Sequence, residues 1–180
     1  MCGKDVLQWF VMRDLKRSNA RQHAYEQLEE LGITVFTPKV KKMVVRQGKR
    51  SLVETPYIPS PLFVRGSRGQ IDEIVGQIPL LQYQWHPYRW HDPMVVSDVA
   101  MENFMQAVAA ALSPQYYLPS EVTPSMQNRR IRIIGGPLDG QEGTLVTTRG
   151  SKVKRLLVEL PGLLAVSVEV SCEYIRVIGD

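Results

Sequence analysis

The sequence is poor in cysteine and has no long hydrophobic run. Its two cysteines, Cys2 and Cys172, lie at opposite ends of the 180 residues, without Cys-x-x-Cys spacing or a neighbouring histidine. We therefore expect neither a disulfide nor a metal site. No stretch approaches the ~18 consecutive apolar residues of a membrane-spanning helix, and residues 1–5 lack the apolar core of a signal peptide. The sequence predicts a cytoplasmic protein with no membrane segment.

The common catalytic signatures are also missing. The chain has no G-x-S-x-G, phosphate-binding loop, HExxH or strand-linked G-x-G-x-x-G. Asp139 and Glu142 are close in sequence but belong to a turn region, and His86 and His91 have no third metal ligand near them. We predict a protein that is not an enzyme and uses no cofactor.

Positive charge is unevenly distributed along the chain. The net charge is +4, which permits a polyanionic partner. Six basic residues and no acidic residue lie between Lys39 and Arg50, and a second basic group contains Lys16, Arg17 and Arg21. Each group has two readings, a nucleic-acid contact or an ordinary solvated surface.

The first part of the chain alternates predicted strands and helices, which is typical of an α+β or α/β sandwich. A helix with Ala24, Leu28 and Leu31 on one face follows a cap at Ser18 or Asn19 and ends at Gly32. The other predicted elements are strands at 6–12, 33–36 and 57–65, a charged hairpin at 39–55 that turns at Gln47-Gly48, and helices near 71–78 and 97–112.

The remainder of the chain is predicted to be a linker followed by short strands. Residues 113–128 contain three prolines and no clear period, so they are predicted to be the linker, with Tyr116 and Tyr117 able to dock on a neighbouring surface. Five strands are predicted at 131–134, 144–147, 154–160, 163–170 and 174–178. A small closed barrel would remove the exposed edges of so short a sheet.

A glycine-rich turn connects the first two of these strands. Gly135, Gly136 and Gly140 suit positive φ, and Gly143 beside a strand indicates a bulge or a close backbone approach. The glycines alone would fit a tight turn in any small barrel. The whole string, R-I-I-G-G-P-L-D-G-Q-E-G-T-L-V at 132–146, resembles the KOW motif of NusG-type transcription elongation factors and some ribosomal proteins.

The N-terminal part resembles the NGN domain of the same family. The matching segments, in the family's order, are Trp9-Phe10-Val11, Leu31-Gly32-Ile33 with Val35-Phe36-Thr37-Pro38, Gly48-Lys49-Arg50, residues 57–64 and Val95-Val96-Ser97-Asp98. The resemblance spans almost the whole chain. It implies an α+β protein with an NGN sandwich at 5–112, a mostly antiparallel sheet with flanking helices, then a linker at 113–128 and an all-β KOW barrel at 129–180.

Two segments depart from the usual family pattern. Ser60-Pro61 replaces the Gly-Tyr of P-G-Y, and residues 160–165 replace the I-F-G-R-x-T-P loop of the barrel. In housekeeping members this loop region contacts the termination factor Rho and a small-subunit ribosomal protein, the partners that the resemblance implies for the barrel. Together with the aromatic Tyr83-x-Trp85 stretch after the second predicted helix, these departures are more similar to the specialised UpxY-type antiterminators of capsular polysaccharide operons, with RfaH a more distant relative.

The resemblance also implies two interfaces. An apolar depression would accept the β′ clamp helices of bacterial RNA polymerase, and its residues would be Trp9, Phe10, Tyr57, Pro59, Leu62 and Phe63. These residues could instead be ordinary core. Close to the first helix, Lys16, Arg17, Arg21 and His23 would face the non-template DNA strand, or would form a hydrated basic surface.

The function that the resemblance implies is transcription elongation or antitermination by a protein that keeps polymerase processive. Within the family the alternative is a housekeeping NusG. Outside it, the alternative is a KOW-containing protein that binds RNA or the ribosome.

Overall fold

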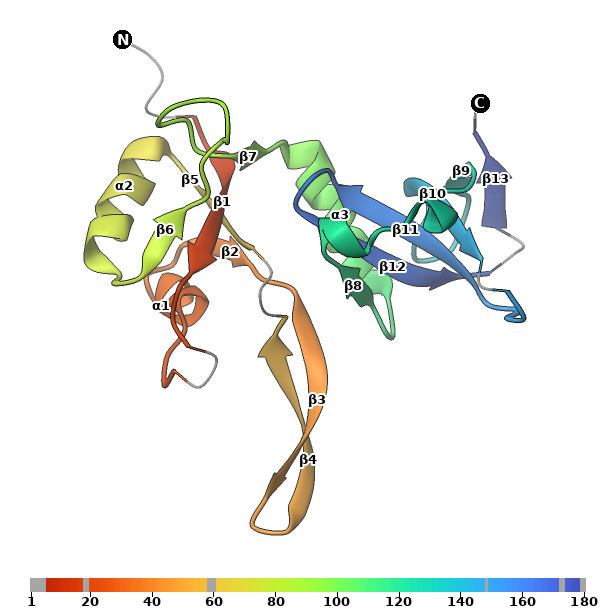
Figure 1. Cartoon of the computed structure of the whole chain (residues 1–180), viewed down its shortest axis with the longest axis horizontal. Helices are drawn as coiled ribbons and strands as arrows, with labels where there is room; N and C mark the ends of the chain where they lie inside the picture. Colours follow the sequence, from red (N-terminus) through yellow and green to blue (C-terminus); the bar gives the residue numbers. More distant parts are fainter. Residues whose placement is uncertain (1–5, 18–19, 58–60, 148, 172–173, 179–180) are drawn as a thin grey trace. The chain divides into compact units, whose positions relative to one another are not determined.

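The computed structural model describes residues 6–17, 20–57, 61–147, 149–171 and 174–178. The chain divides into two compact units, Met1–Asp98 and Val99–Asp180, whose elements are shown in Figure 1. Within the described ranges, none of the helices has the length and apolarity needed to cross a membrane.

The first unit is built on an antiparallel sheet around β1. Its strands are β1 (Gln8–Asp14), β2 (Thr34–Phe36), β5 (Leu62–Gly66), β6 (Leu81–Tyr83) and β7 (Val95–Val96). The order is β2-β5-β1-β6, and β7 pairs with the first half of β1 beyond the end of β6. The predicted antiparallel sheet with flanking helices is confirmed.

Two helices, α1 (Ala24–Glu30) and α2 (Arg68–Gln77), pack against one face of this sheet. Phe10 and Met12 of β1 belong to the same buried cluster as Leu28 of α1 and Ile71 of α2. Because side chains alternate along a strand, Trp9 and Val11 lie on the opposite face. Both are buried as well, so β1 is covered on both faces.

The start of α1 differs from the prediction. The helix begins at Ala24, and the carboxylate of Asp14 accepts a hydrogen bond from the Ala24 amide at 2.7 Å. The predicted caps, Ser18 and Asn19, lie outside the described residues. Gly32 ends the helix with φ +72°, as predicted, but Leu31 is exposed instead of buried. A cap supplied by a preceding strand cannot be recognised from local sequence.

Two glycines, Gly76 in α2 and Gly66 at the end of β5, differ in the space that an added side chain would find. A Cβ added at Gly76 would meet no atom within 4 Å, and Gly costs about 0.5–1 kcal/mol against Ala inside a helix. We expect Gly76→Ala to raise the free energy of unfolding by about 0.5 kcal/mol. Gly66→Ala is the matched control, because its Cβ would lie 2.7 Å from Ile71 Cδ1. Urea titration that ranked Gly66→Ala as the more stable variant would contradict this packing.

Strands β3 (Lys39–Arg46) and β4 (Lys49–Pro56) form a separate two-stranded sheet. They turn at Gln47 and Gly48, which both have positive φ. Figure 1 shows this hairpin as a long arm that extends away from the sheet of the first unit. The predicted charged arm is therefore confirmed, and its exposed side chains include the apolar Met43 and Leu52 as well as the basic residues.

The second unit, which starts at Val99, contains α3 (Asp98–Ala110) except for its first residue, and a six-stranded antiparallel sheet. The strands are β8 (Gln115–Tyr117), β9 (Arg130–Ile133), β10 (Glu142–Thr147), β11 (Lys154–Leu160), β12 (Leu164–Val170) and β13 (Ile175–Val177). Their order is β13-β9-β10-β11-β12-β8. This confirms an all-β C-terminal part. Closure of the sheet into a barrel stays a prediction, because no pairing joins β8 to β13 among the described strands.

The predicted linker is more ordered than its composition suggested. Strand β8 pairs with β12 through Tyr117 and Ala165, and Tyr116 is buried. Two 3-10 helices follow, η1 (Pro119–Glu121) and η2 (Pro124–Met126), and Met126 packs against a core cluster of the sheet. The expected docking of the two tyrosines is thus present. The boundaries at 112 and 129 stay predictions.

Candidate functional site

The residues predicted to contact polymerase have little exposed area. The exposed fractions are 3% for Trp9, 1% for Phe10, 4% for Leu62 and 0% for Phe63. Tyr57 is half-buried and donates its amide hydrogen to Pro38 O at 2.8 Å. Pro59 lies outside the described residues. As they stand, these side chains fit the alternative of core residues, and polymerase contact stays a prediction.

The same set is divided between two faces of the sheet. Phe10 and Leu62 belong to the cluster that α1 and α2 cover. Phe63 pairs with Val11 across β1 and β5 and so shares the opposite face with Trp9. Its ring lies 6.2 Å from that of Phe36 on β2. The structure therefore brings Trp9 and Phe63 to one face but excludes Phe10 and Leu62 from it.

A charged pair marks the end of the Trp9–Phe63 face. Arg65 is opposite Trp9 in the β1–β5 register, and its guanidinium lies 3.3 Å from the carboxylate of Asp98. Both side chains are partly exposed, so this pair is accessible to a partner where Trp9 is not. Sequence reasoning missed Arg65. Its position next to the apolar Val64 in a strand was the available signal.

Asp14 organises the loop between β1 and α1. Its carboxylate accepts hydrogen bonds from the amides of Lys16, at 2.9 Å, and Ala24, at 2.7 Å. The ring Nδ1 of His23 lies 3.5 Å from the same carboxylate. The ammonium of Lys16 donates to Gln22 O at 3.2 Å. Lys16 and His23 therefore hold the loop together, which limits their availability to a ligand.

Arg17 and Arg21 are the exposed members of the predicted nucleic-acid group. The sequence predicts this group on the loop and first turn of the helix. Both arginines lie on the loop, because α1 begins only at Ala24, where Asp14 caps it. Two exposed guanidinium groups are suited to contacts with phosphates. His23 instead stacks on Tyr25, with ring centroids 6.0 Å apart.

The glycine-rich turn has the conformation that its sequence predicts. Gly135, Gly136 and Gly140 have φ of +87°, +72° and +78°. Asp139 accepts a hydrogen bond from the Gly135 amide at 2.5 Å. A Cβ at Gly143 would lie 2.2 Å from Leu157 O, so this glycine permits close backbone approach of β10 and β11. These four glycines shape the turn and the strand pairing.

Glu142 lies between two arginines beside this turn. Arg132 donates to its carboxylate, and Arg130 lies 3.5 Å away. The hydrogen bond from Arg132 holds the pKa of Glu142 below its usual value. A lowered pKa contributes stability above the unfolded-state pKa, and this contribution is lost as pH falls through the folded-state pKa.

We therefore expect Glu142→Gln to destabilise the protein slightly at neutral pH and to have less effect at acid pH. The difference in free energy of unfolding between wild type and variant, measured by urea titration across pH 3 to 7, should shrink as pH falls below about 4.3, the ordinary glutamate pKa. A difference that grows on acidification would contradict the role of Arg132.

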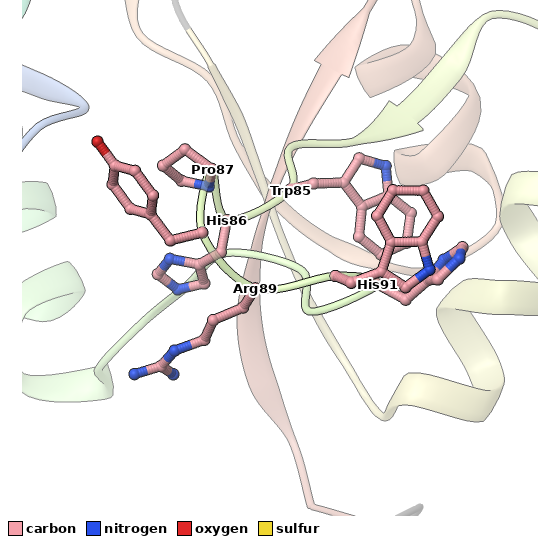
Figure 2. Close-up of a pocket in the computed structure, with 7 residues that line it drawn as sticks. Trp85, His86, Pro87, Arg89 and His91 are labelled. Atoms are coloured by element: carbon pink, nitrogen blue, oxygen red, sulfur yellow. The ribbon is translucent and has the colours of Figure 1, made fainter.

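A hollow of about 560 Å³ lies in the first unit at the loop between β6 and β7. Figure 2 shows the seven residues that line it, Trp85, His86, Pro87, Tyr88, Arg89, Trp90 and His91. The sequence shows this aromatic stretch, which contributed to the resemblance to specialised antiterminators but was not predicted to be a binding site. Among the described residues, no group of three or more His, Cys, Asp or Glu side chains is placed to hold a metal ion.

Comparison with known proteins gives a family match that covers most of the first unit. The family described as "Transcription termination factor nusG" matches residues 7–105, more than half of the chain. A solved structure, "Domain interaction in Thermotoga maritima NusG", is similar with 16% identity and a TM-score of 0.46, covering 97% of this chain and 98% of that one. No curated protein matches significantly. The match on residues 7–105 shows that the chain belongs to the NusG family of transcription factors.

Proposed function

We propose that this protein is a transcription elongation or antitermination factor that binds bacterial RNA polymerase through its N-terminal domain. The observation that carries the proposal is the family match, which includes every strand and both helices of the first unit. The matched residues include the antiparallel sheet, its two helices and the projecting arm.

In this proposal the domain bridges the polymerase clamp across the DNA channel. A bridge that binds the closed clamp more tightly than the open clamp shifts the population toward the closed form. Pausing and termination need clamp opening, so the bound factor favours processive synthesis. The size of the effect equals the difference in binding free energy between the two clamp states.

The proposed contact with the β′ clamp helices uses the face that holds Trp9 and Phe63. Since these side chains have almost no exposed area, binding requires a conformation in which this face is uncovered. A fractionally populated competent state lowers apparent affinity by that fraction. The partly exposed Arg65–Asp98 pair at the same face is available for the first contact.

The direct experiment is capture of purified bacterial RNA polymerase by the tagged full-length protein. We expect polymerase to be retained, and retention to persist at salt concentrations that remove nonspecific nucleic-acid contacts, because the proposed clamp contact is mainly apolar. An unrelated protein of similar net charge is the control. Retention no greater than that of the control would reject the proposal.

We also propose that Arg17 and Arg21 contact the non-template DNA strand. The Arg17→Glu/Arg21→Glu variant should bind free polymerase as wild type does but protect the strand less in footprints of paused complexes. Binding of this variant to paused complexes should also depend less on salt than binding of the wild type, since fewer counterions are released from the DNA. The matched control is Lys41→Glu/Lys42→Glu on the arm, and equal protection by wild type and the Arg17/Arg21 variant would contradict this role.

The targets that we propose are specific operons such as those for capsular polysaccharide synthesis. The support is the sequence of residues 160–165, which departs from the housekeeping loop. In the folded chain, Leu160, Leu163 and Leu164 of this segment are buried, which leaves Pro161 and Gly162 exposed. A ribosomal protein or Rho would therefore meet only a short Pro-Gly turn at this loop. Loss of the gene should reduce promoter-distal transcripts of a target operon more than promoter-proximal ones.

A further inference from the structure

The loop between β6 and β7 exposes two large aromatic side chains. Tyr88 is 97% exposed and Trp90 is 91% exposed, although both lie within a folded unit. Aromatic side chains contribute strongly to binding when a partner covers them. A pair this exposed, next to a hollow, indicates an interaction site.

A series of ring contacts connects Trp90 to the buried core. The ring of Trp90 lies 4.7 Å from His91, His91 lies 5.8 Å from Trp85, and Trp85 lies 5.4 Å from Tyr83. Tyr83 is buried, and its hydroxyl donates to Asp72 at 2.9 Å. The exposed indole is thus connected, ring by ring, to the core of the unit.

The backbone of the loop is restrained as well. The His86 amide donates to Asp92 O at 2.9 Å, and Trp85 forms a β-bridge with Pro93. The guanidinium of Arg89 lies 3.4 Å from the carboxylate of Asp92. A loop that is fixed before binding loses less conformational entropy on binding. The exposed rings are thus presented by a preorganised structure.

The hollow is lined by flat aromatic rings together with a basic side chain, a combination that suits a ligand with planar rings and negative charge. Its lining combines the rings of Tyr88 and Trp90 with Arg89 and the imidazoles of His86 and His91. Figure 2 shows the Arg89 side chain extending from the loop on the side opposite to Trp85. Aromatic, histidine and arginine side chains are the groups that stack on unpaired bases. A site for an aliphatic peptide would instead present aliphatic side chains.

We propose that residues 85–91 bind single-stranded nucleic acid, with Trp90 and Tyr88 stacking on bases and Arg89 close to the phosphates. Unpaired strands are required because bases within a duplex already stack on one another. The site is separate from Arg17 and Arg21. β6 runs antiparallel to β1, so the aromatic loop lies beside the first half of β1, whereas Arg17 and Arg21 follow its end.

The test is binding of labelled oligonucleotides to the full-length protein, followed by fluorescence anisotropy. Oligo-dT and oligo-U probes distinguish DNA from RNA, and a duplex of equal length is the competitor. We expect at least one single strand to bind more tightly than the duplex. Trp90→Ala and Tyr88→Ala should each weaken binding roughly 5- to 150-fold, the range for loss of one stacked base.

Two further variants, Trp90→Phe and Arg89→Ala, distinguish the contribution of stacking from that of charge. Trp90→Phe should retain most of the affinity because it keeps an aromatic face. Arg89→Ala should reduce the salt dependence of binding, whereas Trp90→Ala should leave it unchanged. Leu112→Ala, at a fully exposed residue of the other unit, is the control for an unrelated surface change.

Three outcomes would overturn the inference: no binding of either single strand, tighter binding of the duplex, or wild-type affinity in Trp90→Ala. The assay contains no polymerase, so its failure would leave the proposed polymerase contact unaffected. Equally, a protein that fails to retain polymerase could still bind these oligonucleotides.

Discussion

Phe63→Leu is expected to weaken capture of bacterial RNA polymerase roughly 30-fold or more, the effect of losing an interface hot spot. Phe10→Leu should leave capture almost unchanged. The two residues make a matched pair, since both are buried in the same sheet, on neighbouring strands. They differ in the face that they occupy, because Phe10 packs toward α1 and α2 and Phe63 does not. Binding constants measured with purified polymerase check the difference.

Stability must be measured alongside binding for this pair. Each substitution removes an aromatic ring from a buried site, so each should destabilise the fold by roughly 1–3 kcal/mol. Similar urea midpoints with unequal polymerase binding would locate the interface on the Phe63 face. Equal losses of stability and of binding in both variants would show that Phe63 acts only as core.

Gly143→Val is expected to be the most damaging change in the second unit. Its Cβ would lie 2.2 Å from Leu157 O, a backbone atom of the paired strand that cannot move without separating β10 from β11. Overpacking of this kind costs about 3 kcal/mol or more. For a unit of this size, the melting temperature should fall by roughly 10 °C or more, as measured by circular dichroism.

Gly140→Ala is the control for Gly143→Val, because it separates space from backbone conformation. At Gly140 φ is +78° and a Cβ would meet no atom within 4 Å. The cost is then only that of a left-handed conformation, about 1–2 kcal/mol. Equal destabilisation by the two substitutions would contradict the close approach of β10 and β11.

Strong local patterns were sufficient to predict much of the second unit. The strand at 154–160 has the predicted bounds as β11, since turn formers lie on both sides of a segment centred on Leu156, Leu157 and Val158. The positive φ of Gly135, Gly136 and Gly140 also follows from residue type, because only glycine adopts that region without strain. In these places the local preference and the tertiary structure agree.

Elements that depend on distant partners were not predictable in the same way. β8 has three residues, and only its pairing with β12 makes it a strand. The predicted helix face extended to Leu112, which lies beyond the end of α3 and is fully exposed. Both errors arise because tertiary contacts, and not periodicity, set these boundaries.

The candidate interfaces show the same limit. Alternation along β1 separates Trp9 from Phe10, but the sequence does not say which face the helices cover. Exposure of Arg17 and Arg21 follows from their charge, whereas the role of Lys16 within the loop depends on a hydrogen bond to Gln22 O. The ring contacts that support Trp90 likewise need the folded loop, although the aromatic residues themselves are evident in the sequence.

Transcription by purified polymerase on a template with a defined pause site decides whether the protein is an elongation factor. Adding the full-length protein should shorten the pause and increase the fraction of full-length transcript, because a bridged clamp opens less often. The Phe63→Leu variant should give a smaller effect at equal concentration than the Phe10→Leu variant. Unchanged pause duration and transcript length at protein concentrations that saturate polymerase binding would contradict the proposed function.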